Sequence, residues 1–329
     1  VYLSADSKAY FEMNGGVISN GKASSGGGVY VDDGLFKMTG GEITGNTCGG
    51  WGGGVAVFES GSADCDSKFI MEGGKITDNT ASNGGAVAVY ENCEFEMNGG
   101  EISGNTGNSY SAGVFLSGAV FTMTEGAIKD NKSLYGGAVY VGDIDSNGVK
   151  SAFKMTGGEI TGNGHIGTGD NGGGVTVASG AFTMDGGVIG GNSAHTASGG
   201  GVCVYDRFIF NGGEISNNSA INGGAIMAYG EDCYFEMNGG VISENSVSQN
   251  GAAIYVSQKP TVIINGGEIK NNKAVGQGAV YILEGSEVTM NGGVITGNTS
   301  TNGGGVNVLQ GKFTLNNGKI TENITTGSY

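Results

Sequence analysis

The sequence predicts an all-β fold, a right-handed parallel β-helix (a solenoid) with three short strands per coil and about twelve coils. Aligning the 329 residues on the pattern Gly-Gly-x-Ile gives twelve units spaced 25 to 33 residues apart, a period typical of solenoids. Within each unit, apolar and polar residues alternate over short segments, as in strands with one buried face. Glycine supplies 70 residues and proline one, a proportion unlike that of helical proteins or ordinary α/β enzymes.

Each unit contains three strand-like segments. The first has the pattern F-x-M, as in 95–97, and the second is G-G-x-I-x-x-N. The third is G-G-[GA]-V-x-V, as in 136–141, with Ala in some units and a third Gly in others. The Gly-Gly pairs stand where the chain must bend tightly or approach its neighbour closely. We therefore expect equivalent residues of successive coils to stack in rows along the axis, with Phe, Met, Ile and Val rows as the core.

An asparagine follows the Ile by three residues in eleven of the twelve units. A side-chain amide both donates and accepts, so stacked amides can bond to one another and to the corner backbone, at about 1 kcal/mol each. We interpret this row as structural. Its members are Asn46, Asn79, Asn105, Asn131, Asn163, Asn192, Asn218, Asn245, Asn272, Asn298 and Asn323.

Charge and composition exclude several function classes. The chain has 15 Lys and Arg against 31 Asp and Glu, a formal charge of −16 that would repel a phosphate backbone, so no nucleic-acid partner is expected. No apolar run approaches the roughly 18 residues of a membrane helix, so membrane insertion by this segment is not expected. Five cysteines without C-x-x-C pairs argue against a zinc module, although Cys65 and Cys93, on one edge of adjacent coils, can pair.

We predict one β-helix domain over 1–329. Val1 begins within a third-strand segment, and the chain stops after an Ile-x-x-Asn segment without the strand that should follow. Solenoids cover their open ends with capping elements, and neither end supplies one. The sequence therefore reads as an excerpt of a longer protein, expected to be monomeric.

The repeats resemble those of a known family. The pairing of [IF]-x-x-N with a following G-G-A-[IVL], as in 76–79 and 84–87, resembles the repeats of chlamydial polymorphic outer membrane proteins. It is also similar to β-helical adhesin-like surface proteins of gut bacteria and methanogens. The resemblance covers the whole chain and implies an extracellular, cell-surface adhesive segment. Two features depart from the family pattern: Ile usually replaces Phe before the Asn, and many units have Gly-Gly-Gly.

Aromatic residues form the first candidate binding site. Between the asparagine row and the third strand lie Trp51, Tyr110 and Tyr135, and the outward row of that strand adds Phe115 and Tyr140. Exposed aromatic rings beside polar groups suit stacking against a glycan or a protein ligand. The alternative is that these residues only reflect the preference of aromatic side chains for strand surfaces.

Acidic residues on the opposite edge form the second candidate, a calcium site. The stretch 143–148 places Asp143, Asp145 and Asn147 in the D-x-D-x-N-G pattern of a calcium loop, whose oxygen ligands alternate on a tight turn. Position twelve is Lys154 instead of Glu, so an EF-hand is excluded, and the alternative is a solvated polar turn. A second acidic cluster comprises Glu59, Asp64, Asp66, Glu91 and Glu94.

The predicted function is a non-catalytic cell-surface adhesin or stalk segment that presents a ligand-binding surface on a rigid rod. Its expected partner is a host or microbial surface glycan or protein. The alternative is a polysaccharide lyase or glycoside hydrolase, because such enzymes use carboxylates paired with each other or with basic residues. The chain has a single arginine, Arg207, and no evident catalytic constellation, so no catalytic residue is predicted.

Overall fold

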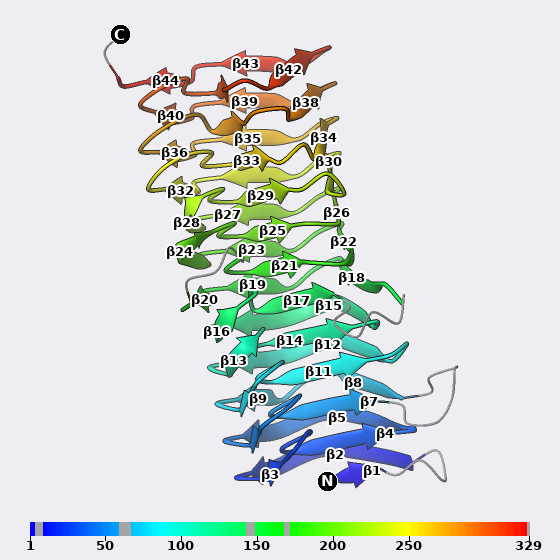
Figure 1. Cartoon of the computed structure of the whole chain (residues 1–329). Helices are drawn as coiled ribbons and strands as arrows, with labels where there is room; N and C mark the ends of the chain where they lie inside the picture. The colour runs from blue at the N-terminus through cyan, green and yellow to red at the C-terminus, as the bar shows by residue number, and fades with distance from the viewer. Residues whose placement is uncertain (4–8, 59–66, 143–148, 168–171, 328–329) are drawn as a thin grey trace.

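The computed structural model describes residues 1–3, 9–58, 67–142, 149–167 and 172–327. These residues wind into a parallel β-helix of about twelve coils, with the two termini at opposite ends of a rod (Figure 1). The described part contains no helix, and therefore none that is long and apolar enough to cross a membrane. Every strand pair is parallel and joins one coil to the next, which confirms the predicted fold class.

Sheet A is formed by the G-G-[GA]-V-x-V segments. Its strands are β1 (Tyr2–Leu3), β4 (Val29–Asp32), β7 (Val55–Phe58), β11 (Val87–Tyr90), β14 (Val114–Ser117), β17 (Val139–Gly142), β21 (Val175–Val177), β25 (Val202–Val204), β29 (Ile226–Tyr229), β33 (Ile254–Ser257), β37 (Val280–Ile282) and β41 (Val306–Val308).

Sheet B contains both the F-x-M and the x-I-x segments, which the Gly-Gly bend joins. Its strands are β2 (Ala9–Ser19), β5 (Gly34–Thr44), β8 (Lys68–Met71), β9 (Lys75–Thr77), β12 (Glu94–Ser103), β15 (Val120–Lys129), β18 (Ser151–Met155), β19 (Glu159–Thr161), β22 (Gly180–Met184), β23 (Val188–Gly190), β26 (Arg207–Phe210), β27 (Glu214–Ser216), β30 (Tyr234–Met237), β31 (Val241–Ser243), β34 (Thr261–Ile264), β35 (Glu268–Lys270), β38 (Glu287–Met290), β39 (Val294–Thr296), β42 (Lys312–Leu315) and β43 (Lys319–Thr321).

Sheet C is formed by short strands directly after the asparagine row. Its strands are β3 (Lys22–Ala23), β6 (Thr47–Cys48), β10 (Thr80–Ala81), β13 (Thr106–Tyr110), β16 (Lys132–Tyr135), β20 (Gly164–His165), β24 (Ser193–Ser198), β28 (Ser219–Asn222), β32 (Ser246–Val247), β36 (Lys273–Ala274), β40 (Thr299–Ser300) and β44 (Ile324–Thr325). The coil is three-sided as predicted, but two of the predicted segments share sheet B, and sheet C supplies the third side.

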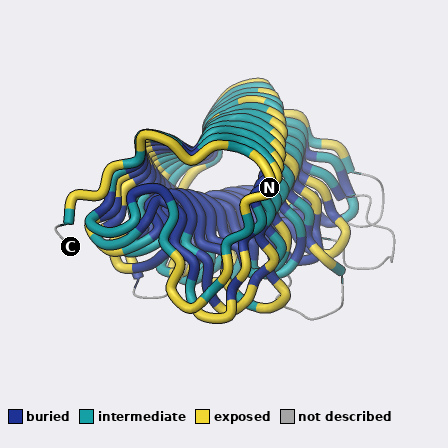
Figure 2. The backbone as a smooth tube through the Cα atoms, turned by 90° about the horizontal axis from the view of Figure 1, so that it is seen from above, coloured by how far each residue is buried: buried dark blue, intermediate teal, exposed yellow. Residues whose placement is uncertain are grey.

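One hydrophobic core runs along the whole axis, and the buried residues of successive coils form continuous bands when the rod is viewed end on (Figure 2). Its most regular row is a stack of phenylalanines, in which Phe95 and Phe121 lie 4.7 Å apart between ring centroids and 5° from parallel. Parallel register produces this stacking, because it places each residue beside its equivalent in the next coil.

The second glycine of the Gly-Gly bend is required by its conformation. Gly100 has a φ of 82°, and a Cβ added there would lie 2.6 Å from Cε of Met71 in the preceding coil. Any other residue would be strained by the left-handed backbone and would also collide with the methionine row. Glycine is therefore needed at this bend of sheet B.

Candidate functional site

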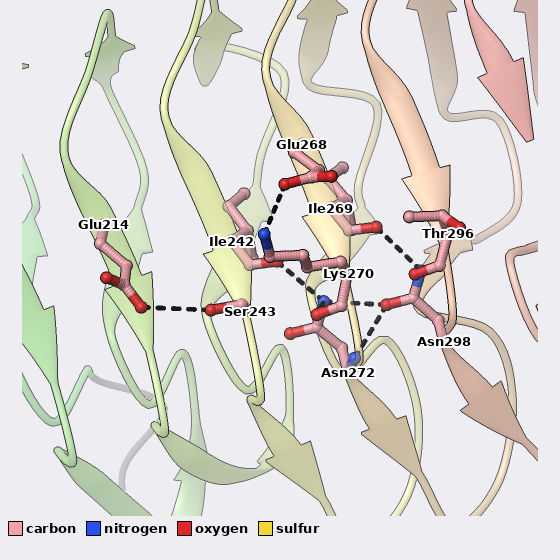
Figure 3. Close-up of polar contacts among 9 residues, drawn as sticks. All are labelled: Glu214, Ile242, Ser243, Glu268, Ile269, Lys270, Asn272, Thr296 and Asn298. Carbon is pink, nitrogen blue, oxygen red and sulfur yellow. Dashed lines mark hydrogen bonds and ion pairs between the residues drawn. The ribbon is translucent and has the colours of Figure 1, made fainter.

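The repeated asparagines form a buried ladder at the corner between sheets B and C. Asn272 shows the pattern in Figure 3: its Nδ2 donates to Oδ1 of Asn298 at 2.9 Å and to the carbonyl oxygen of Ile242 at 3.0 Å. Its backbone N–H also donates to Oδ1 of Asn298, at 2.9 Å. Links of this kind run from Asn46 to Asn323 with Nδ2 to Oδ1 distances of 2.8 to 3.0 Å. The structural interpretation of this row is confirmed.

The predicted aromatic site is a cluster on the outer face of sheet A, and it is only partly exposed. Phe115 is fully buried and Tyr140 is 7% exposed, so the expectation that these two rings are exposed is wrong. Tyr110, the last residue of β13, covers them, with its ring centroid 6.5 Å from that of Phe115 and 5.0 Å from that of Tyr140. Burial raises the pKa of Tyr140 to about 12, with a smaller contribution from Tyr110.

Three of the predicted aromatic residues remain accessible. Tyr135 is 39% exposed, and Trp51 and Tyr110 are partly buried. The rings of Tyr110 and Tyr135 lie 6.1 Å apart, and Trp51 meets the buried Tyr90 edge-on at 5.5 Å. We call Trp51, Tyr110 and Tyr135 the aromatic patch. All three come from the stretch between the asparagine row and the third strand, as the sequence predicted.

The cluster also contains two rings that sequence analysis missed, Phe58 and Tyr90, stacked 4.4 Å apart. In their coils the outward position of sheet A is held by Ala56 and Ala88, and each aromatic residue stands two positions later. Residues two apart on a strand share a face, so the small alanines leave room for these rings. An alanine followed two residues later by an aromatic was the signal in the sequence.

The predicted calcium ligands Asp143, Asp145 and Asn147 lie outside the described residues. The same holds for Glu59, Asp64 and Asp66 of the second acidic cluster, whereas Glu94 pairs with Lys68 at 3.0 Å. Within the described ranges, no group of three or more His, Cys, Asp or Glu is arranged to hold a metal ion.

The cysteines divide between a disulfide and buried or half-buried thiols. Cys93 is disulfide-bonded, and its expected partner Cys65 lies outside the described residues. Cys233, at the position of Cys93 several coils later, is a buried free thiol, and burial raises its pKa to about 12. A thiol with so high a pKa is a poor nucleophile at neutral pH.

A second asparagine row lies on the outside of the rod, at the Gly-Gly bend of sheet B. Neighbouring members are linked from Nδ2 to Oδ1 at 2.8 to 2.9 Å, and all are exposed. Sequence analysis missed this row. Its signal is an asparagine directly before Gly-Gly, or before Asn-Gly in the last coil, which recurs in the last five coils. The members are Asn211, Asn238, Asn265, Asn291 and Asn316.

Comparison of the chain with protein-family models, with curated proteins and with solved structures finds no match. The functional conclusion therefore depends on the geometry of the coil and of its surface.

Proposed function

We propose that this chain is a non-catalytic segment of an extracellular, cell-surface adhesin or stalk, which presents the aromatic patch to a glycan or protein ligand. The observation that carries the proposal is the construction of that patch. Trp51 packs on the buried ring of Tyr90 and Tyr110 on the buried ring of Phe115, both of which are part of the rod itself, and Tyr135 packs against Tyr110. Rings held in this way lose little conformational entropy when a ligand stacks on them.

The rest of the coil supports a scaffold function. The repeated asparagines of the buried ladder form hydrogen bonds with their equivalents in the next coil. Many described charged residues are also paired across coils, for example Lys37 with Glu72 at 3.0 Å and Lys129 with Glu101 at 3.0 Å. These contacts maintain a straight, regular rod, which is what a display segment needs.

The experiment is a binding screen of the whole chain on a glycan array and on immobilised extracellular-matrix proteins. We expect Trp51→Ala and Tyr135→Ala each to weaken the ligand found by about tenfold, because stacking on one aromatic ring contributes about 1 to 1.5 kcal/mol. The control is Tyr10→Ala, which removes a 57% exposed tyrosine from the outer face of sheet B. Equal affinity of all three variants and the wild type would contradict the proposal, as would the absence of any ligand.

A further inference from the structure

The corner where sheet A leads into sheet B varies in sequence from coil to coil. On four successive coils its described residues are 149–150, 178–179, 205–206 and 230–233, along one edge of the rod (Figure 1). A hollow of about 390 Å³ opens there, lined by Lys150, Ala178, Ser179, Tyr205, Asp206 and Asp232. A cation, a hydroxyl, an aromatic ring and two carboxylates from four coils meet in this hollow.

Two of these groups are held in place by the coil. Oδ2 of Asp206 accepts a hydrogen bond from the backbone N–H of Gly180 at 2.8 Å. The same oxygen accepts one from Nζ of Lys150 at 2.7 Å, from two coils away. Asp206 is half-buried, so these bonds orient both its carboxylate and the lysine before any ligand arrives.

Two other groups have unused hydrogen-bonding capacity. Asp232 is exposed, and it forms no ion pair or hydrogen bond through its side chain with any other described residue. The Ser179 hydroxyl also has no partner within the described part of the chain. A carboxylate has about four acceptor positions and a hydroxyl both donates and accepts, so both can bond a ligand hydroxyl.

One wall of the hollow is aromatic. Tyr205 lines it, and the ring of Tyr229 meets the Tyr205 ring edge-on at 5.8 Å and 71°. Tyr229 is itself 39% exposed. Beside the hollow, the guanidinium of Arg207 lies 4.5 Å from the ring centroid of Tyr234. The corner therefore combines an apolar face with polar groups of both signs, the usual composition of a small-ligand site.

We propose that this corner binds a neutral saccharide. The carboxylates of Asp206 and Asp232 accept hydrogen bonds from adjacent sugar hydroxyls, Lys150 and Ser179 donate to sugar oxygens, and the C–H face of the sugar packs on Tyr205. Hydrogen bonds with an ionised partner are about twice as strong as neutral ones, which compensates for the open, water-exposed position. The two carboxylates outnumber the one lysine in the lining, and this balance disfavours an anionic ligand.

The length of the site indicates a short oligosaccharide. The four coils that supply its polar groups span three coil spacings, roughly 14 Å at about 4.8 Å each. The lining of the corner shares no residue with the aromatic patch, so the inference does not depend on the proposed function.

The experiment is calorimetric titration of the whole chain with cellotetraose, maltotetraose and mannotetraose, with trigalacturonate as the anionic comparison. We expect at least one neutral tetrasaccharide to bind, and Asp232→Asn and Lys150→Met each to weaken it by at least tenfold. Both side chains are exposed, so both variants should fold, which thermal melting verifies. The matched controls are Lys312→Met and Glu287→Gln, an exposed ion pair of 3.1 Å on the outer face of sheet B in later coils, and neither should change the affinity.

Three outcomes would overturn the inference: no neutral tetrasaccharide binds, the two corner variants bind as tightly as the wild type, or trigalacturonate binds more tightly than every neutral probe. Binding that is lost in Trp51→Ala but retained in Asp232→Asn would overturn the corner site and support the aromatic patch. The reverse pattern would support the corner, and the separate binding screen tests the aromatic patch.

Discussion

Two rows of asparagine run along this rod, one buried at the corner between sheets B and C and one exposed at the bend of sheet B. Their amide-to-amide hydrogen bonds are nearly identical, 2.8 to 3.0 Å in the buried row and 2.8 to 2.9 Å in the exposed one. They differ in what surrounds them. Ten of the buried asparagines are 0 or 1% exposed and also bond the backbone, whereas the exposed amides face water. Hydrogen bonds of equal length in the two rows therefore need not contribute equally to the stability of the fold.

The two rows also differ in extent. The buried ladder runs through eleven coils, whereas the exposed ladder occupies only the last five. In the seven earlier coils the same bend carries Asn14, Thr39, Glu72, Asn98, Thr124, Thr156 and Asp185. The coil winds equally well in both halves, so it does not need the exposed amides. We therefore expect the buried row to contribute much more than the exposed row to the free energy of unfolding.

The largest effect is expected for Asn192→Ala in the middle of the buried ladder. Oδ1 of Asn192 accepts hydrogen bonds from both the backbone N–H and Nδ2 of Asn163, and its own Nδ2 donates to Ile160 and Asn218. Alanine leaves buried donors and a carbonyl without partners, at about 1 to 3 kcal/mol each. We expect a loss of about 3–5 kcal/mol of unfolding free energy, measured by urea denaturation.

Because solenoid coils contact only their neighbours, the same variant should open locally. Hydrogen exchange should accelerate most in the coils of β23 to β28 and less toward the ends of the rod. A loss below about 1 kcal/mol, or a uniform acceleration, would show that the ladder is not what holds adjacent coils together.

A smaller effect, confined to alkaline pH, is expected for the hydroxyl of the buried residue Tyr140. Its pKa is raised from 10.0 to about 12 in the folded chain, chiefly by burial. Below pH 10 the hydroxyl is protonated in both the folded and unfolded states, so its contribution to stability is constant. Between pH 10 and 12 only the unfolded state ionises, and the free energy of unfolding falls by about 1.4 kcal/mol per pH unit, roughly 3 kcal/mol in total.

Tyr140→Phe should lack this alkaline loss. The measurement is urea unfolding of the wild type and the variant at pH 8, 10 and 12, because the difference between them isolates Tyr140 from the other tyrosines. If the two proteins lose stability in parallel over this range, the hydroxyl is not buried as described.

The regular rows of the coil could be predicted from the sequence, whereas sheet C could not. The rows of Phe95, Ile102 and Asn105 recur at fixed positions, so the fold, the core and the buried ladder were all predictable. Sheet C was not, because a strand such as Thr80–Ala81 is too short to show an alternating pattern.

The candidate sites were less predictable than the coil. The outward position of Phe115 followed from strand alternation, but its burial depends on rings from neighbouring coils and on Tyr110 at the end of β13. The hollow at Asp206 depends on a lysine 56 residues away in sequence. Contacts between non-repeating residues of different coils cannot be derived from the repeat alone, and both proposed binding surfaces are built from such contacts.

The smallest effect is expected for Asn265→Ala in the exposed ladder, the matched counterpart of Asn192→Ala. Nδ2 of Asn265 donates to Asn238 and to Glu236, and its Oδ1 accepts from Asn291, so the variant removes nearly as many hydrogen bonds. Water replaces them all, since every partner is at the surface. We expect a change within about 0.5 kcal/mol in the same urea experiment. A loss approaching that of Asn192→Ala would mean that cooperative polarisation along the amide chain, rather than the burial of its ends, gives an asparagine ladder its strength.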